Sequence, residues 1–125
     1  MLPDPTFDSE YVEVRKSPVH GKGLCAKSRL SPGLRIADYK GHEYHITEYK
    51  NKYKCYQYCY TMNRIHKVLD GRPFLTQNPS HYCNESLTPN VALRKKGLFT
   101  LREIEPNEEL FLSYPHFYTR DYSLK

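Results

Sequence analysis

The sequence predicts a single, mainly β domain built of several short strands, with one or two short helices. The 125 residues and the 38% hydrophobic content allow one modest core and leave no room for a second one. Turn-forming residues recur at short intervals along the whole chain, at 17–18, 21–23, 31–33, 40–41, 70–71, 78–79, 88–89 and 106–107. Between these turns lie runs rich in β-branched and aromatic residues, at 11–14, 34–39, 56–61, 91–93, 98–101 and 110–113, with a weaker one at 65–69.

One segment has a helical period instead. Its apolar residues fall three or four apart, at Ile46, Tyr49, Tyr53, Tyr56 and Tyr60. The spacing predicts a helix that passes into a strand near Cys55, and an aromatic stripe of this kind is typical of a core face. Residues 1–9, which include Pro3 and Pro5, are expected to form a flexible arm ahead of a domain that spans residues 10–125.

The formal charge of the chain is +5, and its charged residues gather in basic and acidic clusters. Each cluster has two possible roles. Lys50, Lys52 and Lys54, and the run at 94–96, are either a solvated surface or a contact for phosphates such as those of nucleosomal DNA. Acidic residues gather at 103, 105, 108 and 109, where they either attract a basic peptide or form the rim of a turn.

The sequence lacks a membrane-spanning run, a secretory signal and paired cysteines, and these features bear on cellular location and metal binding. No apolar run approaches the ~20 residues that cross a bilayer, and the first residues lack the basic-then-apolar pattern of a secretory signal. We therefore expect an intracellular protein without membrane contact. Its four cysteines, at 25, 55, 59 and 83, are expected to be reduced thiols. They lack paired Cys-x-x-Cys spacing, so no metal site is expected.

Three separated segments carry the chemistry. In Gly21-Lys22-Gly23-Leu24 the glycines serve either a turn or the close approach of a ligand to the backbone. Asn84-Glu85-Ser86 and Pro89-Asn90 place two amides where they would bridge neighbouring backbone groups, although an asparagine in a surface turn is the simpler interpretation. The third segment runs from Leu101 to Tyr114, and its Asn107 suits a turn with left-handed backbone.

The order and spacing of these segments resemble the SET domain of protein lysine methyltransferases, over about residues 10–123. The resemblance implies a β-clip-like fold with a threaded C-terminal segment, in a minimal, stand-alone SET domain. It also implies the cofactor S-adenosylmethionine and a catalytic hydroxyl at Tyr114. It implies cofactor contacts at Lys22, Gly23, Leu24, Tyr82, Asn84, Glu85, Tyr114 and Phe117, and a substrate channel at Tyr58 and Tyr118.

Further expectations follow from the resemblance alone. The substrate is expected to be a histone tail, and the protein to be nuclear or chromatin-associated, in the host cell if its source is viral. A homodimer would complete the substrate groove of so small an enzyme.

The chain departs from the family pattern at Glu85, where a histidine is usual, at Leu87, where a cysteine is usual, and at Pro115, which replaces a glycine. Two other interpretations therefore stay open: a catalytically weak or inactive SET-like module that binds peptides or chromatin, and a basic β domain that binds nucleic acid.

Overall fold

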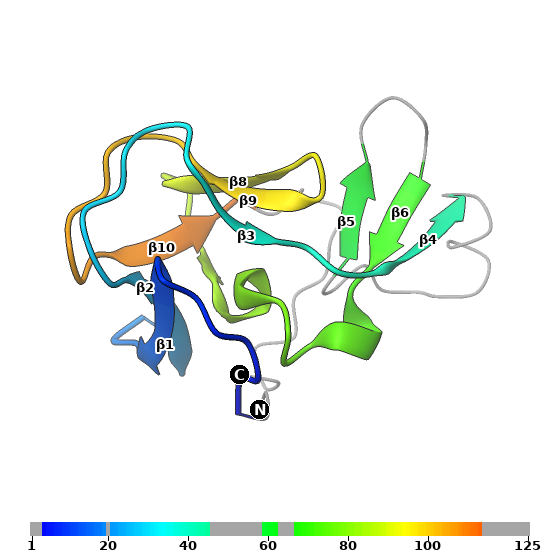
Figure 1. The fold of residues 1–125 in the computed structure, drawn as a ribbon, viewed down its shortest axis with the longest axis horizontal. Helices are drawn as coiled ribbons and strands as arrows, with labels where there is room; N and C mark the ends of the chain where they lie inside the picture. The colour runs from blue at the N-terminus through cyan, green and yellow to red at the C-terminus, as the bar shows by residue number, and fades with distance from the viewer. Residues whose placement is uncertain (1–3, 20, 46–58, 63–66, 114–125) are drawn as a thin grey trace.

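The computed structural model describes residues 4–19, 21–45, 59–62 and 67–113, which form three small sheets (Figure 1). The first has the strand order β1 (Val12–Lys16), β2 (Lys22–Ala26), β10 (Glu109–Leu112), β7 (Asn84–Glu85). The second has the order β3 (Arg35–Asp38), β9 (Gly97–Thr100), β8 (Val91–Arg94), and the third β4 (His42–His45), β6 (Lys67–Asp70), β5 (Cys59–Met62). The predicted mainly β architecture of several small sheets is confirmed.

Short helices are the minor component, as expected. Two 3-10 helices, η1 (Arg72–Phe74) and η2 (Pro79–Tyr82), each have a proline in their first turn. Proline suits that position because its fixed φ matches the helix and its missing N–H has no partner there anyway. The helix predicted from Ile46 to near Cys55 lies outside the described residues. The strand predicted after it, at 56–61, is described from Cys59 on, where β5 begins. Within the described part of the chain, no helix is long and apolar enough to span a membrane.

The first sheet joins segments that are far apart in the sequence. Strand β10 lies at its centre, antiparallel to β2 through Leu110 opposite Leu24, and parallel to β7 through Phe111 opposite Asn84. Alternate residues of β10, Leu110 and Leu112, are buried, and this period of two is what a strand with one core-facing side requires. The sheet therefore brings the residues around 22–26, 84–85 and 109–112 side by side.

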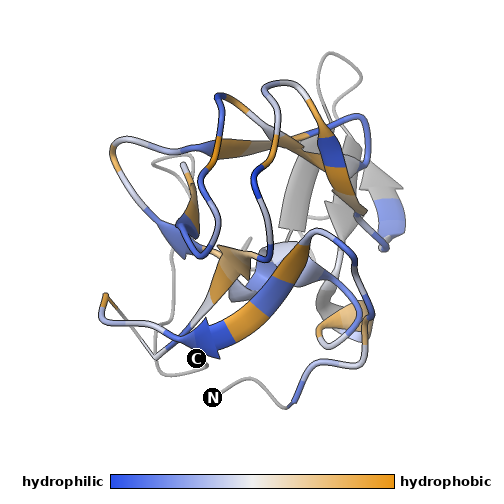
Figure 2. Cartoon of the chain, turned by 60° about the vertical axis from the view of Figure 1, so that its left-hand side comes forward, coloured by the Kyte–Doolittle hydropathy of each residue, from blue (hydrophilic) through white to orange (hydrophobic). Residues whose placement is uncertain are grey.

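The hydrophobic core lies between the first and second sheets. Apolar and polar residues alternate along strands such as β1 (Figure 2), so that each strand turns one side inward. The buried cluster draws on both sheets and on the loops between them, and consists of Val12, Leu24, Ala26, Leu30, Ile36, Tyr82, Cys83, Val91, Leu98, Ile104, Leu110 and Leu112.

The segment before β1 makes specific contacts with the domain. The Thr6 N–H donates to the carbonyl of Thr76 over 2.8 Å, and the ring of Phe7 lies 5.9 Å from the buried ring of Tyr82. The Lys27 ammonium donates to the carbonyl of Ser9 over 2.6 Å. Whether residues 1–9 move independently of the domain stays a prediction.

Candidate functional site

The turn between β1 and β2 is closed by its own backbone and by one serine. The Ser17 N–H donates to the carbonyl of Gly21 over 2.7 Å, and Gly21 has a φ of +47°, where a side chain would be disfavoured. The Ser17 hydroxyl accepts from the Val19 N–H at 3.0 Å and donates to the carboxylate of Glu109, 2.9 Å from Oε1. The turn is thereby fixed to the start of β10.

Gly23 is required by packing at this point. A Cβ on Gly23 would lie 2.7 Å from Oε2 of Glu109 and 3.0 Å from Cβ of Ser17. The first distance is shorter than real Cβ atoms show and the second is unusually tight, so the missing side chain makes room for the Glu109 carboxylate. The second glycine of the motif thus has a structural role that is independent of any ligand.

The amide of Asn84 joins all three segments of the motif. Its Nδ2 lies 3.2 Å from the carbonyl oxygen of Lys22, 3.0 Å from Oε2 of Glu109 and 3.3 Å from Oγ of Ser17. The side chain is almost fully buried, and a buried amide without such partners would be costly. The predicted contact of this amide with neighbouring backbone is present at Lys22, and its other two contacts are with side chains.

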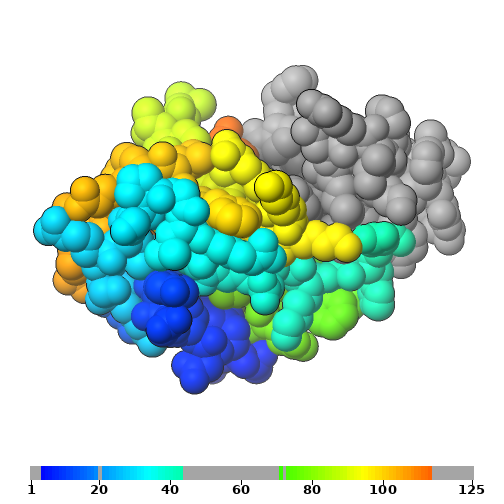
Figure 3. Space-filling model, turned by 45° about the horizontal axis from the view of Figure 1, so that its top comes forward, coloured from blue at the N-terminus to red at the C-terminus, as the bar shows by residue number. Residues whose placement is uncertain are grey.

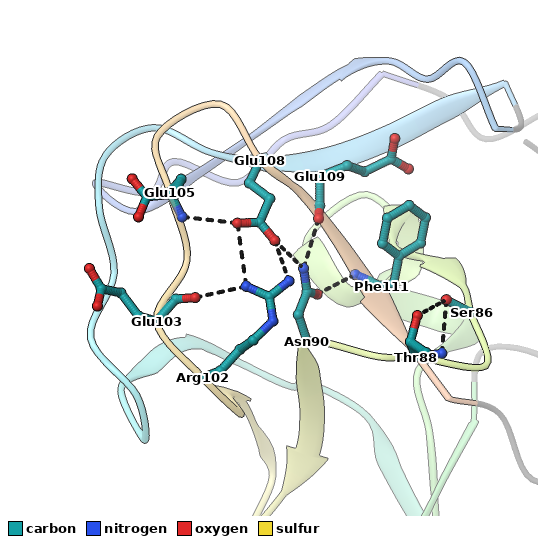
Figure 4. Close-up of polar contacts among 9 residues, drawn as sticks. All are labelled: Ser86, Thr88, Asn90, Arg102, Glu103, Glu105, Glu108, Glu109 and Phe111. Carbon is teal, nitrogen blue, oxygen red and sulfur yellow. Dashed lines mark hydrogen bonds and ion pairs between the residues drawn. The ribbon is translucent and has the colours of Figure 1, made fainter.

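Asn90 performs the corresponding task on the other side of β10 (Figure 4). Its Nδ2 donates to the carbonyl of Glu109 over 2.9 Å, and its Oδ1 accepts from the N–H of Phe111 over 2.7 Å. The main chain of Asn90 also donates to the carbonyl of Phe111, over 3.1 Å. Its predicted bridging of backbone groups is confirmed, and β10 is held from both sides by buried amides.

The acidic residues at 103–108 pair with two arginines. Arg29 lies 3.0 Å from the carboxylates of both Glu103 and Glu105, and Arg102 pairs with Glu108 at 2.5 Å. The hydrogen bond from Arg102 is the main cause that holds the pKa of Glu108 below its ordinary value. Two arginines offset two of these three negative charges, and the fourth acidic residue, Glu109, is bonded to the uncharged Ser17 and Asn84. The loop therefore keeps negative charge, and both interpretations of the cluster, the rim of a turn and a surface for a basic peptide, stay predictions.

Asn107, within this loop, has the left-handed backbone that was predicted for it. Its φ is +69°, and its N–H donates to the carbonyl of Ala26 over 2.8 Å. Asparagine tolerates this conformation better than most residues with a side chain.

Two of the four cysteines, Cys25 and Cys83, lie in the described part of the core, and neither is in a disulfide, as predicted. Cys25 follows Leu24 in β2, and burial raises the pKa of its thiol, with a further contribution from the carboxylate of Glu109. A thiol with a raised pKa is protonated at neutral pH and is a poor nucleophile. Cys25 is therefore a packing residue of the site's inner wall.

The predicted cofactor-binding residues differ in their exposure to solvent. Leu24 and Tyr82 are fully buried, so Leu24 could meet a ligand only through its main chain. Lys22 and Glu85 are half-buried, and the Lys22 ammonium lies 3.3 Å from the Asp4 carboxylate. Glu85 pairs with Leu112 across β7 and β10. Contact of these residues with a cofactor stays a prediction.

Four predicted site residues lie outside the described residues: Tyr58, Tyr114, Phe117 and Tyr118. The catalytic assignment of Tyr114 is thus not tested. In the sequence Tyr114 follows the end of β10 by two residues, and the last residue of β10 is paired with Glu85.

A cavity of about 430 Å³ lies beside the β1–β2 turn, lined by residues 4–5, 14–16 and 21–22. Its wall combines apolar surface from Pro5 and Val14 with charged side chains of both signs, those of Lys22 and Asp4 among them.

Sequence reasoning missed two residues of this site, Ser17 and Glu109. Ser17 was interpreted only as a turn residue, and Glu109 only as part of an acidic cluster. The available signal was the position of each: Ser17 directly precedes the glycine-containing turn, and Glu109 opens the strand that leads to Tyr114. The pairing of the two, 92 residues apart, requires the tertiary structure.

A comparison with protein families identifies the family to which this arrangement belongs. The family model of the SET domain matches residues 21–115, a range that includes the 21–24 turn, both bridging asparagines and the whole of β10. Members of this family are generally protein lysine methyltransferases that use S-adenosylmethionine. Because the match covers most of the chain and its three motifs meet in one sheet, the protein belongs to the SET-domain family.

Proposed function

We propose that the protein is an S-adenosylmethionine-dependent protein lysine N-methyltransferase that acts on a histone tail. The observation that supports the activity is the buried amide of Asn84, which links the Lys22 carbonyl to the Glu109 carboxylate. It holds the glycine-containing turn, the asparagine segment and the strand leading to Tyr114 in one place.

The chemistry of the cavity beside the turn fits the cofactor. The amino-acid part of S-adenosylmethionine carries a carboxylate, an ammonium group and a short apolar chain. In the cavity, Lys22 would hold the carboxylate, Asp4 the ammonium group, and Val14 and Pro5 the chain. The main chain at Asn84 and Glu85 would hold the adenine. When bound, the cofactor supplies a methyl group on a positively charged sulfur.

The residues of the chain must then hold the substrate lysine so that its amine is neutral and correctly placed. A lysine amine has a pKa of ~10.4, so only about one in a thousand is neutral near pH 7.4, a cost of about 4 kcal/mol. A channel of aromatic side chains, which we assign to Tyr58 and Tyr118, lowers this pKa because it removes water from the ammonium. The Tyr114 hydroxyl would orient the amine within about 3–3.5 Å of the methyl group without becoming charged.

The histone substrate, the chromatin location and the homodimer are supported by the family resemblance. The three acidic side chains at 103–108 face only two arginines, so this loop keeps a negative charge that would favour a basic tail.

The proposal is tested by incubating the protein with radiolabelled S-adenosylmethionine and a mixture of core histones. We expect label on a histone, and we expect Tyr114→Phe to remove most of it. Tyr11→Phe is the matched control, because it deletes a phenol hydroxyl at the start of β1, and it should retain full transfer. Thermal unfolding of both variants shows that each is folded.

Two outcomes would reject the assignment. Cofactor binding with no transfer to histones or to a broad peptide library would indicate the non-catalytic, peptide-binding alternative. Equal transfer by Tyr114→Phe and by the wild type would remove Tyr114 from the catalytic role.

A further inference from the structure

The turn between β8 and β9 has an unusual composition for its backbone. The two strands pair Arg94 with Gly97, so only Lys95 and Lys96 form the loop. Both have positive φ, +50° and +58°. Two-residue hairpin turns of this kind strongly favour Asn-Gly, because left-handed backbone crowds the Cβ of other residues. Two consecutive lysines therefore occupy this turn at a conformational cost.

The turn is supported by a side chain from a neighbouring strand. Arg35 of β3 donates from Nη1 to the carbonyl of Lys95 over 3.3 Å and from Nη2 to the carbonyl of Lys96 over 3.0 Å. Its guanidinium carbon lies 5.3 Å from the centre of the Phe99 ring. Gly97 makes room for it, since a Cβ there would lie 2.6 Å from that carbon. The turn is a rigid platform whose supporting group is itself a cation.

The charges of this platform are only partly neutralised. Arg35 pairs with Asp38 at 2.8 Å, and Lys96 pairs with Glu43 at 2.7 Å. Arg94 and Lys95 are exposed, and neither forms an ion pair in the part of the chain that the structure describes. In Figure 3 the hairpin (yellow) lies along β3 (cyan) on one face of the molecule, with its charged turn at one end.

We propose that this turn, formed by Arg94, Lys95 and Lys96 and supported by Arg35, binds the phosphate backbone of duplex DNA. Local backbone strain that the surroundings hold in place is typical of functional positions. The turn presents Arg94 and Lys95 as exposed cations, which suits contacts that recognise phosphates rather than base sequence. The net charge of +5 favours a polyanionic partner over a neutral one. An acidic peptide is the competing partner.

The binding would be electrostatic and dependent on salt. Each phosphate contact contributes about −0.9 to the slope of log K against log salt concentration. If Arg94 and Lys95 each neutralise one phosphate, they account for about −1.8 of that slope. Their contribution to affinity would then fall about 12-fold between 50 and 200 mM NaCl.

The test is fluorescence anisotropy of a labelled 20-base-pair DNA, titrated with the full chain at 50 to 200 mM NaCl, without cofactor. Arg94→Gln/Lys95→Gln should weaken binding at 50 mM at least tenfold and reduce the magnitude of the slope by about 2. Lys16→Gln/Lys27→Gln is the matched control, because it removes two exposed cations from the β1–β2 side. It should change the slope by less than 0.5.

Equal losses in the two double variants would overturn the assignment to this turn. Displacement of the DNA by polyglutamate at the same concentration of charges would overturn the choice of DNA as partner, as would the absence of binding at 50 mM. Binding is measured without cofactor or histone, so a negative result leaves the proposed methyl transfer untouched.

Discussion

Substitution of Gly23 by alanine should destabilise the fold, because the new methyl group would displace the Glu109 carboxylate. The Cβ would lie 2.7 Å from Oε2 of Glu109, and the carboxylate would have to leave its bonds to Ser17 and Asn84. Hydrogen bonds to a charged group contribute about 1.5–3 kcal/mol each. Partial resolvation of Glu109, together with the smaller entropy of unfolded alanine, offsets part of the loss. We expect a net cost of about 2–3 kcal/mol.

A double-mutant cycle measured by urea unfolding separates this clash from other effects. In the Glu109→Ala background only the 3.0 Å approach to Cβ of Ser17 remains. Gly23→Ala should then cost less than about 1 kcal/mol, so the coupling energy exceeds about 1 kcal/mol. Gly33→Ala is the control: it has a φ of +72° and no atom within 4 Å of the new Cβ. It should cost about 1 kcal/mol in either background.

Two results would refute this reasoning. One is additivity of Gly23→Ala and Glu109→Ala within about 0.5 kcal/mol. The other is a Gly23→Ala protein of unchanged stability that binds S-adenosylmethionine poorly, which would show that Gly23 serves only the cofactor.

Three further changes test other parts of the structure. Asn90→Ala leaves two backbone groups of β10 without their side-chain partner and should cost about 2–3 kcal/mol in urea unfolding, and a loss below about 0.5 kcal/mol would contradict its bridging role. Lys95→Asn/Lys96→Gly relieves the left-handed backbone and should raise the free energy of unfolding by about 1–2 kcal/mol, whereas a decrease would show that the turn is not strained. Arg102 is the main cause that lowers the pKa of Glu108 in the folded state. The charged carboxylate therefore stabilises the folded state at pH values above the ordinary pKa of about 4.5. This stabilisation is lost as the pH falls through the lowered pKa. Glu108→Gln should therefore show a shallower loss of urea midpoint from pH 5 to pH 3 than the wild type, and parallel curves would contradict the assignment.

Much of the fold could be predicted because its local signals are strong. The β-prone runs at 11–14 and 110–113, and the turn residues between strands, are properties of short segments, and they coincide with β1 and β10. The left-handed backbone of Asn107 followed from the residue type alone. Strands β4 and β7 escaped prediction for physical reasons: His42–His45 contains two histidines and a glutamate, and Asn84–Glu85 is a two-residue strand held by its neighbour β10.

The inner structure of the site could not be predicted in the same way. The contact of Ser17 with Glu109 joins residues from opposite ends of the domain, and no local pattern marks either as a partner. From the sequence, the glycines of the 21–24 motif serve either a turn or the close approach of a ligand. A third reason, the close side chain of Glu109 at Gly23, has no local signal and is visible only in the 2.7 Å approach.

The central claim is that the 21–24 turn and the asparagine segment form one cofactor site beside β10. Titration of ¹⁵N-labelled protein with S-adenosylhomocysteine, followed by amide chemical shifts, tests it directly. The account predicts that the amides of Lys22, Gly23 and Glu85 shift together along a single saturating curve, while those of the β8–β9 turn remain in place. Shifts confined to residues outside the first sheet, or none at saturating ligand, would contradict it.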